Sequence, residues 1–546
     1  MTPLEAAEAA LTADRDHDDP SIWIARLPDE AIRAKARTLE AEGPRGRKFW
    51  GVPFAVKDNI DIAGLPTTAG CPGFAYTAVA TAPVVQRLLH EGALLIGKTN
   101  LDQFATGLVG TRSPYGVPRN VFDAAYVPGG SSSGSACAVA AGIVPFALGT
   151  DTAGSGRVPA AFGNIVGLKP TRGSVSARGV IPACRSLDTV SVFARSVDEA
   201  LDVLRVIAGF DADDAYSRAA PWPHLRKGVA PTTARIATAD TVDISLFLEI
   251  ARLLYDGPWV AERTAGLRDV VETRPDILHP VTREILEGGL TRRSVDAFGA
   301  FHRVAEARRA AESLFREYDA LLLPTAPFCP TLAEVAAEPI GVNSRLGAYT
   351  NFVNLCDLAA IAVPAGFDSS GMPTGATLIG PAWSEGRLAA LADRIHRAST
   401  DRVGGTRAPL PSPTAPDALG ADETALFCIG AHMSGLPLNH QLTAIGGRFL
   451  RVAATAPLYR LFALGDRPGL LRVQDGGTIE GEAWALPTTA IGALLASVPP
   501  PLGFGTVELS DGPCLGFLAE AEGVAAARDI TQHGGWRGWL AAKGTA

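Results

Sequence analysis

The sequence lacks a long uncharged apolar run. The longest candidate, residues 136–149 (ACAVAAGIVPFALG), is interrupted by Gly142 and Pro145 and falls short of the roughly 18 residues that a membrane-spanning helix needs. The chain starts with an acidic amphipathic pattern, MTPLEAAEAALTADRD, and not with the basic and then apolar pattern of a secretory signal. We therefore predict no membrane association, a buried core helix over 136–149 and a cytoplasmic protein.

Positive charge is not in excess either. The 49 Lys and Arg are outnumbered by 57 Asp and Glu, which gives a net charge of −8 and argues against a surface for nucleic acid. The seven cysteines are odd in number and scattered, without CxxC or Cys/His ligand spacing: Cys71, Cys137, Cys184, Cys329, Cys356, Cys428 and Cys514. We expect reduced, mostly buried thiols, no bound metal and no cofactor.

The chain is organised as two domains, because 546 residues exceed one compact core. Residues 1–400 alternate short apolar runs with amphipathic helical stretches, which predicts an α/β fold whose sheet is covered by helices on both faces. Residues 401–422 are dense in Pro, Gly and Ala, as linkers are. Residues 423–546 restart with a strand-like run and predict a second, smaller α+β domain.

Two Gly/Ser-rich turns carry the strongest chemical signal. GGSSSGSA (129–136) and DTAGSGR (151–157) lie at either side of an apolar stretch, and such turns can point several backbone N–H groups at one spot. Flexible loops or a phosphate nest would show similar glycines, but neither turn contains GxxxxGK(S/T) or GxGxxG. A serine in such a turn becomes a nucleophile only beside a base.

No histidine lies near the two turns in the sequence to act as that base. All nine histidines lie away from the two turns in sequence, so a Ser-His-Asp relay has no local support. Lys57, at the end of the apolar run VPFAVK (52–57), can serve instead if it is neutral; the plainer alternative is an ordinary surface lysine. Its reference pKa of about 10.4 must fall by roughly 2–3 for work near pH 7–8, and burial can supply that.

Three segments together resemble the amidase signature family. They are GVPFAVKDNIDIAG around Lys57, GGSSSGSA around Ser131, and GTDTAGSGRVPAAFGNIVGLKPT around Ser155, and the likeness covers about residues 30–400. The resemblance implies the amidase signature fold, with a mixed central sheet, and hydrolysis of an amide bond. The spacing between the two serines agrees with the family pattern.

The resemblance also implies a role for each residue. Ser155 is the nucleophile, Ser131 follows a cis peptide bond and passes the proton, and Lys57 accepts it. Backbone N–H groups of Thr152, Ala153, Gly154 and Ser155 form the oxyanion hole, and Gly129 and Gly130 contact the substrate. From their positions in the turns alone, Ser132 and Ser133 are expected to give hydrogen-bonding support, and Asp151 and Arg157, on either side of the nucleophile turn, to brace it.

Two further segments narrow the substrate. LLYDGPWVAER (253–263) and NSRLGAYTNFVNLCDLAAIAVP (343–364) resemble the allophanate hydrolase family, whose members break urea-1-carboxylate to ammonia and carbon dioxide. This resemblance implies that Tyr255 and Arg263 contact the substrate, with the arginine paired to its carboxylate, a geometry that suits a small anionic amide. Without the resemblance, Arg263 fits a solvated helix residue.

The C-terminal domain carries a likeness of its own. LFCIGAHMSGLPLNHQL (426–442) resembles the C-terminal domain of allophanate hydrolases, which is similar to γ-glutamyl cyclotransferase-like domains. The implied role is decarboxylation of the N-carboxycarbamate that the amidase step releases, with His432 as proton donor. A structural histidine at a strand end fits equally well, Glu482 is a second candidate acid, and His440 fits a structural role.

Two other functions stay open at this point. The chain could be a general amidase of the same family, or an amidotransferase-type subunit that releases ammonia for a partner. The acidic charge and the appended C-terminal domain disfavour the second of these. The family implies a homodimer, whereas the breadth of the substrate range and the metabolic source of allophanate, from urea carboxylation or triazine breakdown, are not legible in the sequence.

Overall fold

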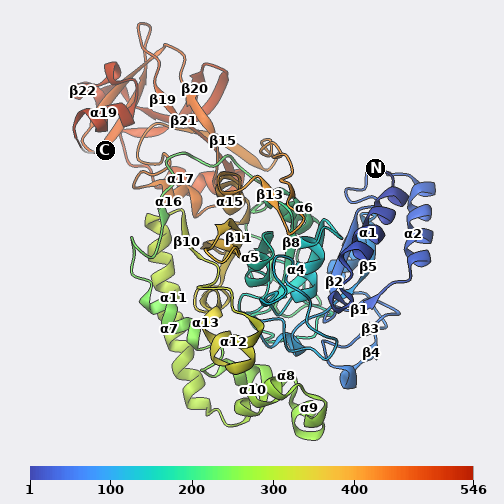
Figure 1. Cartoon of the computed structure of the whole chain (residues 1–546). Helices are drawn as coiled ribbons and strands as arrows, with labels where there is room; N and C mark the ends of the chain where they lie inside the picture. Colours follow the sequence, from blue (N-terminus) through green and yellow to red (C-terminus); the bar gives the residue numbers. More distant parts are fainter. Residues whose placement is uncertain (545–546) are drawn as a thin grey trace. The chain divides into compact units, whose positions relative to one another are not determined.

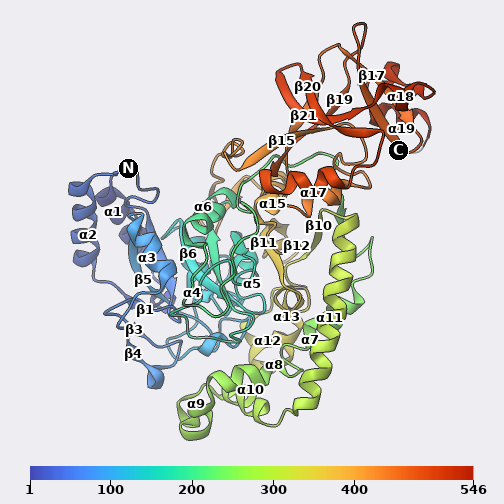
Figure 2. The ribbon, with the colours of Figure 1, turned by 180° about the vertical axis from the view of Figure 1, so that it is seen from behind.

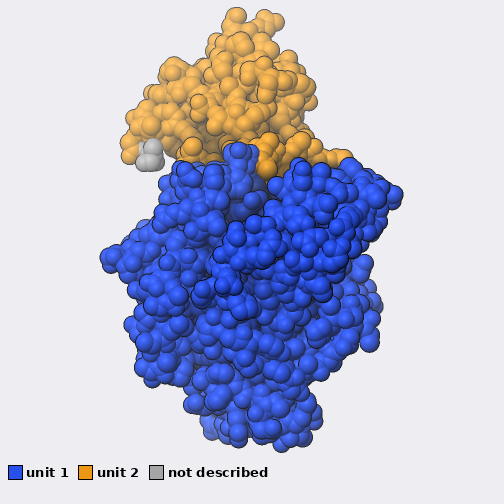
Figure 3. Space-filling model, turned by 45° about the vertical axis from the view of Figure 1, so that its right-hand side comes forward, with its two compact units in different colours: residues 1–220, 237–312, 320–413 blue, residues 221–236, 313–319, 414–546 orange. Residues whose placement is uncertain are grey.

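The computed structural model describes residues 1–544 and divides into two compact units. The first unit comprises residues 1–220, 237–312 and 320–413, and the second comprises 221–236, 313–319 and the chain from 414 onward (Figure 3). Two short segments inside the 1–400 range therefore group with the second unit. The grouping of these two segments depends on contacts with residues that are distant in the sequence. A local sequence pattern does not predict such contacts.

A mixed central sheet forms the middle of the first unit (Figure 1). Its strands, in spatial order, are β1 (Trp23–Arg26), β5 (Leu94–Thr99), β2 (Pro53–Lys57), β6 (Phe146–Asp151), β8 (Thr189–Ala194), β7 (Val166–Lys169), β11 (Leu358–Phe367), β12 (Pro373–Pro381), β10 (Ala320–Pro324) and β9 (Ile236–Ala237). Strands β2, β5 and β6 are parallel, whereas β8 is antiparallel to β6. Parallel pairing at the centre places the carboxyl ends of β2 and β6 at one edge of the sheet.

Helices cover both faces of this sheet (Figures 1 and 2). On one face α4 (Ser133–Ala140) packs on β6 and β2, next to α5 (Val158–Phe162), and the core there extends to α1 (Pro3–His17) and α2 (Asp29–Glu42). On the other face α6 (Val197–Ile207) and α15 (Glu385–Ser399) pack on β7, β8 and β11. The arrangement confirms the predicted α/β fold class.

The predicted helix over 136–149 is only half correct. Helix α4 ends at Ala140, and the same apolar stretch continues as strand β6 from Phe146. Gly142 adopts φ +74° and Pro145 lies directly before the strand, so the two residues that interrupt the run also divide it into two elements. None of the helices within residues 1–544 combines the length and the apolar character needed to span a membrane.

The second unit is built on two small sheets. A five-stranded sheet runs β16 (Arg448–Ala454), β19 (Glu480–Pro487), β15 (Glu423–Cys428), β21 (Gly512–Ala519), β20 (Leu502–Leu509), and a three-stranded one runs β18 (Arg467–Arg472), β17 (Tyr459–Leu464), β22 (Arg528–Asp529). Short helices accompany them: α16 (Asn439–Thr443), α17 (Ile491–Ala496), α18 (Ala521–Val524) and α19 (Trp536–Ala542). Buried Phe427, Tyr459 and Trp484 belong to its apolar core, which is separate from that of the first unit.

Candidate active site

Lys57 lies at the carboxyl end of β2 and is completely buried. Its Nζ lies 2.8 Å from Ser131 Oγ and 2.8 Å from Thr150 Oγ1, with a hydrogen bond to each. Burial lowers the pKa of Lys57 to about 7, against the opposing charges of Asp102, Asp188 and Asp151. A lysine in this state is neutral in a large fraction of molecules near pH 7 and can accept a proton.

Ser131 stands at the start of the α4 segment, directly before Ser132. The Gly130–Ser131 peptide bond is cis, as the family resemblance implied. A Cβ on Gly130 would lie 2.1 Å from Asp102 Oδ2 and 2.5 Å from the backbone nitrogen of Gly110. Only glycine therefore fits at the position that delivers the Ser131 hydroxyl to Lys57.

Ser155 follows β6 in the second Gly/Ser turn and is 2% exposed. Its Oγ donates to the carbonyl oxygen of Gly107 at 3.5 Å, and within residues 1–544 we find no hydrogen bond between Ser131 and Ser155. The structure thus brings Lys57 and Ser131 together, whereas the second step of the relay is not formed in this rotamer. Rotation about one side-chain bond moves a serine Oγ, and catalytic hydrogen bonds often tighten only with substrate present.

The nucleophile turn presents a row of backbone donors. Within residues 1–544 we find no hydrogen-bond acceptor for the N–H groups of residues 152–155. Gly154 adopts φ +140°, and a Cβ there would lie 2.4 Å from Thr350 Oγ1, so the turn requires glycine at this place. Free donors in a fixed turn are what an oxyanion hole needs.

A buried ion pair braces the same turn. Arg157 donates from Nε to Asp151 Oδ2 at 2.9 Å and from Nη2 to Oδ1 at 3.0 Å, and both side chains are fully buried. Arg157 Nη2 also donates to the carbonyl of Thr350 and to Asn354 Oδ1. The pair joins the end of β6 to the segment after Ser155, and its carboxylate accepts no contact from the reacting serines among the described residues.

Asp188 is a member of the site that the sequence did not reveal. Its carboxylate accepts from the Thr152 hydroxyl in a short hydrogen bond and from the backbone nitrogens of Ala183 at 2.9 Å and Cys184 at 3.1 Å. Burial raises the pKa of Asp188 to about 6. A single Asp before an apolar strand shows no pattern that would single it out, and the same holds for Thr150 beside Lys57.

Arg263, on α8 (Trp259–Gly266), is 1% exposed and not solvated. Its Nη1 donates to the carbonyl of Ala105 at 3.1 Å and to Thr106 Oγ1 at 3.0 Å, while Nε and Nη2 have no partner within the described chain. The guanidinium lies 5.5 Å from the centre of the Tyr255 ring, whose buried hydroxyl is also unpartnered among the described residues. A buried cation with free donors is costly unless an anion binds to it.

Arg263 also acts on the lysine. Burial is the main cause of the lowered pKa of Lys57, and the charge of Arg263 lowers it further. Arg263 bonds to Thr106, and Ser155 bonds to the carbonyl of the next residue, Gly107, so the guanidinium lies near the nucleophile. An anion bound at Arg263 would lie within the same site as Lys57 and Ser131.

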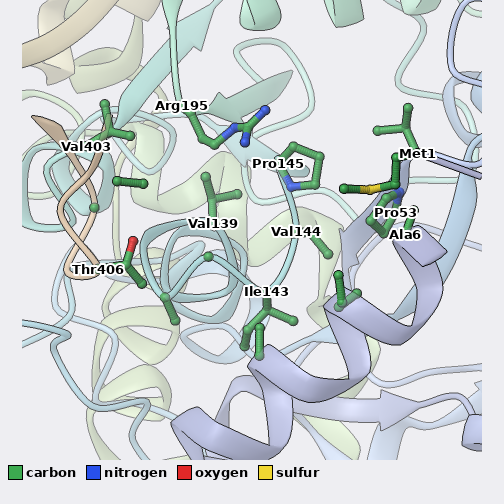
Figure 4. Close-up of a pocket in the computed structure, with 18 of the residues that line it drawn as sticks. Met1, Ala6, Pro53, Val139, Ile143, Val144, Pro145, Arg195, Val403 and Thr406 are labelled. Atoms are coloured by element: carbon green, nitrogen blue, oxygen red, sulfur yellow. The ribbon is translucent and has the colours of Figure 1, made fainter. Parts of the chain in front are cut away.

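The first unit also contains a cavity whose walls include none of the site residues described above. It measures about 500 Å³, and α1, the start of β2, the segment after α4 and residues 403–408 line it (Figure 4). Its walls are mainly apolar, and Arg195, its charged side chain, is paired with Glu199. Without an acid, base or nucleophile this cavity is not a candidate catalytic centre.

His432 and Glu482 of the second unit differ in their surroundings. His432 lines a cavity of about 130 Å³, its Nε2 lies 3.0 Å from Gln441 Oε1, and its ring stacks on Phe517 with centroids 5.1 Å apart. Glu482 instead accepts from Ser434, Trp484 and Arg537. These contacts give Glu482 a structural role and leave His432 as the side chain that faces a cavity; His440 Nδ1 is bonded to the carbonyl of Pro437.

No group of three or more His, Cys, Asp or Glu that could hold a metal ion occurs among residues 1–544.

Comparisons with known proteins show which families and structures this chain is similar to. The amidase family model matches residues 8–245 and 241–389, and the model of the allophanate hydrolase C-terminal domain matches residues 424–541. The selenomethionine-substituted allophanate hydrolase of Kluyveromyces lactis has 39% sequence identity and a TM-score of 0.76, over 100% of this chain and 97% of that one.

Two curated relatives differ in how much of this chain and of their own length the similarity covers. The urea amidolyase of Saccharomyces cerevisiae is 42% identical over 98% of this chain but 32% of its own length. A glutamyl-tRNA(Gln) amidotransferase subunit from Chlorobium luteolum is 32% identical over 74% of this chain and 95% of its own. The chain spans about a third of the length of the two urea amidolyases that it matches.

Proposed function

The chain belongs to the amidase family, and from this membership we propose that it hydrolyses allophanate, urea-1-carboxylate, to ammonia and carbon dioxide. The observation that carries the choice of substrate is Arg263, a buried guanidinium with two nitrogens that have no partner among the described residues. Such a cation selects an amide that also bears a carboxylate. The likeness to an allophanate hydrolase over nearly the whole chain supports the same substrate.

The amidase step uses Lys57, Ser131 and Ser155. Ser155 Oγ attacks the carbon of the terminal carboxamide, and its proton passes through the Ser131 hydroxyl to the neutral Lys57 Nζ. The negative oxygen of the tetrahedral intermediate accepts from the backbone N–H groups of Thr152, Ala153, Gly154 and Ser155, each worth about 3–4 kcal/mol. The relay returns the proton to the leaving nitrogen, ammonia departs, and water releases the acyl group by the same route.

Binding of the substrate falls to the other members of the site. The carboxylate of allophanate pairs with Nε and Nη2 of Arg263, and the Tyr255 hydroxyl donates to it. Gly129 and Gly130 contact the substrate through their backbone, since a Cβ on either residue would collide with neighbouring protein atoms. The released product is N-carboxycarbamate.

The second unit completes the reaction. His432 protonates the nitrogen of N-carboxycarbamate, and the product then loses carbon dioxide. We propose the domain limits 1–400 and 423–546, with 401–422 as linker. The protein works as a homodimer in the cytoplasm, on a small-molecule substrate.

Ammonia release by the purified chain tests the function. We expect turnover of allophanate with no partner added, and a kcat/KM for biuret and for a neutral aliphatic amide lower by about 10²-fold or more, since both lack the carboxylate that malonamate shares with allophanate. Similar rates on all four compounds would identify a general amidase. Ammonia release only after addition of a partner would favour the amidotransferase-type subunit, the function named for the Chlorobium relative.

A further inference from the structure

Asp102 is a buried carboxylate of the first unit that takes no part in the proton relay. It follows β5 closely and is fully buried. Its Oδ2 accepts from the backbone nitrogen of Gly110 and its Oδ1 from that of Arg112, both at 2.9 Å. Hydrogen bonds from N–H groups to a carboxylate are among the stronger ones in proteins. Asp102 therefore closes residues 102–112 into a fixed loop.

The 102–112 loop contacts several functional groups of the site. One of its carbonyl groups accepts from Ser155 Oγ at 3.5 Å, and another accepts from the backbone nitrogen of Gly130 at 2.8 Å. Arg263 donates to the loop through Nη1, at 3.1 Å and 3.0 Å from its two acceptors. The loop thus joins the nucleophile, the turn that carries Ser131 and the buried guanidinium.

Asp102 also packs against the segment that carries Ser131. Its backbone nitrogen donates to the carbonyl of Ser131 at 3.1 Å. A Cβ on Gly130 would lie 2.1 Å from Asp102 Oδ2, and a Cβ on Gly107 would lie 2.6 Å from the same oxygen. The carboxylate therefore lies between two segments, one that delivers the Ser131 hydroxyl and one whose carbonyl accepts from Ser155.

The charge of Asp102 acts on Lys57 as well. Burial is the main cause of the lowered pKa of Lys57, and the charge of Asp102 opposes it. Asp188 and Asp151 oppose it less strongly, whereas Arg263 acts in the same direction as burial. Because β2 and β5 pair in parallel, the chain leaves the sheet for Asp102 at the edge where Lys57 lies. Loss of this negative charge should lower the pKa of the lysine further.

We propose that Asp102 is a positioning residue of the amidase step, whose carboxylate holds in place both the Ser131 segment and the loop carbonyl that accepts from Ser155. The inference rests on the proposed function, which uses these two serines in one relay. Asp102 acts through the loop and through its charge and passes no proton itself. Because the relay serves every amide that reaches Ser155, the loss of Asp102 should slow a neutral amide and allophanate by the same factor.

The kinetic test uses Asp102→Asn in the full-length chain. Asparagine keeps the volume but places an NH₂ group opposite one of the two backbone N–H groups. At about pH 9, where the wild-type lysine is neutral, kcat for allophanate should fall about 10²-fold, since small misplacements of reacting groups cost that much. The preference for allophanate over a neutral amide should change by less than about threefold, and the acid-side midpoint of kcat/KM should move below that of the wild type.

Asp19→Asn is the matched control. Asp19 is a second buried carboxylate that accepts from two backbone nitrogens, those of Ser21 at 3.1 Å and Arg119 at 2.7 Å. Its loss should affect thermal unfolding but leave kcat and the acid-side midpoint as in the wild type. Asp102→Ser, in which water can replace the missing oxygens, is the second variant should Asp102→Asn fail to fold. A kcat within about threefold of wild type at about pH 9, an unmoved midpoint, or an equal loss in Asp19→Asn overturns the proposal.

A labelling test separates Asp102 from the proposed substrate. Phenylmethanesulfonyl fluoride reacts with an activated serine: a bond forms between Ser155 Oγ and sulfur, fluoride leaves, and the serine proton passes through Ser131 to Lys57. Mass spectrometry follows the rate. We expect labelling of Asp102→Asn at least about 10-fold slower than wild type, and labelling of Asp19→Asn at the wild-type rate. Equal rates in Asp102→Asn and wild type overturn the proposal even if allophanate is hydrolysed. Slower labelling of Asp102→Asn in a chain that leaves allophanate intact retains Asp102 and rejects the substrate.

Discussion

Ser155→Ala and Lys57→Met each lower kcat for allophanate by at least about 10³-fold. The first variant removes the attacking oxygen. The second removes the proton acceptor that the structure bonds to Ser131, while methionine keeps the volume of the buried side chain. Because the three residues act as one relay, kcat of the double variant, which carries both substitutions, should lie no more than about twofold below kcat of either single variant. Steady-state ammonia release with each purified variant measures the effect.

Ser133→Ala is the matched control for these variants. Ser133 is a buried serine of the turn that contains Ser131, but its hydroxyl has no partner within the described chain, so its loss should leave kcat within about threefold of wild type. Thermal unfolding of all variants checks that the fold is kept. A Ser155→Ala or Lys57→Met enzyme with more than about a tenth of the wild-type kcat would reject the assigned roles.

Arg263→Met lowers kcat/KM for allophanate by about 10²–10³-fold but leaves turnover of a neutral amide within about fivefold. Truncating one partner of a buried charge pair costs about 2–5 kcal/mol, and only allophanate brings the carboxylate that completes the pair. Tyr255→Phe removes one hydroxyl and should cost about 10-fold on allophanate. The ratio of the two kcat/KM values, measured with the same enzyme preparation, gives the selectivity.

The neutral amide is the internal control, because Nη1 of Arg263 also bonds to Ala105 and Thr106 and its removal can disturb the site as a whole. A structural disturbance would lower both activities by the same factor. An equal loss on both substrates would therefore remove the case for a carboxylate bound at Arg263.

Much of the site in the first unit was predictable because it rests on short contiguous segments. The apolar run before Lys57 indicated a buried strand, and the glycines indicated turns with accessible N–H groups. The structure adds the reason that these segments meet: β2 and β6 pair in parallel, so Lys57 and the Ser155 turn leave the sheet at the same edge. The bond between Lys57 and Ser131 follows from that pairing together with the glycine before Ser131.

The parts that could not be predicted depend on contacts between distant segments. Arg263 has the local pattern of a surface helix residue, and its burial arises from contacts with the 105–106 segment. Asp188 gains its role only when Thr152 folds against it.

The pH dependence of kcat/KM for allophanate tests most directly the claim that a neutral Lys57 accepts the proton. Burial lowers the pKa of Lys57 to about 7. Below that pH the lysine is protonated and cannot act as a base, so kcat/KM should fall tenfold per pH unit on the acid side and level off above about pH 8.

Asp188 would also give an acid limb if its own ionisation controlled the rate, since burial raises its pKa to about 6. Its negative charge raises the pKa of the lysine, which burial lowers. The same profile is therefore measured for Asp188→Asn. We predict a midpoint near pH 7 for the wild type and a lower midpoint for Asp188→Asn. A kcat/KM that stays constant between about pH 6 and 8, or an acid limb that disappears in Asp188→Asn, would contradict the account.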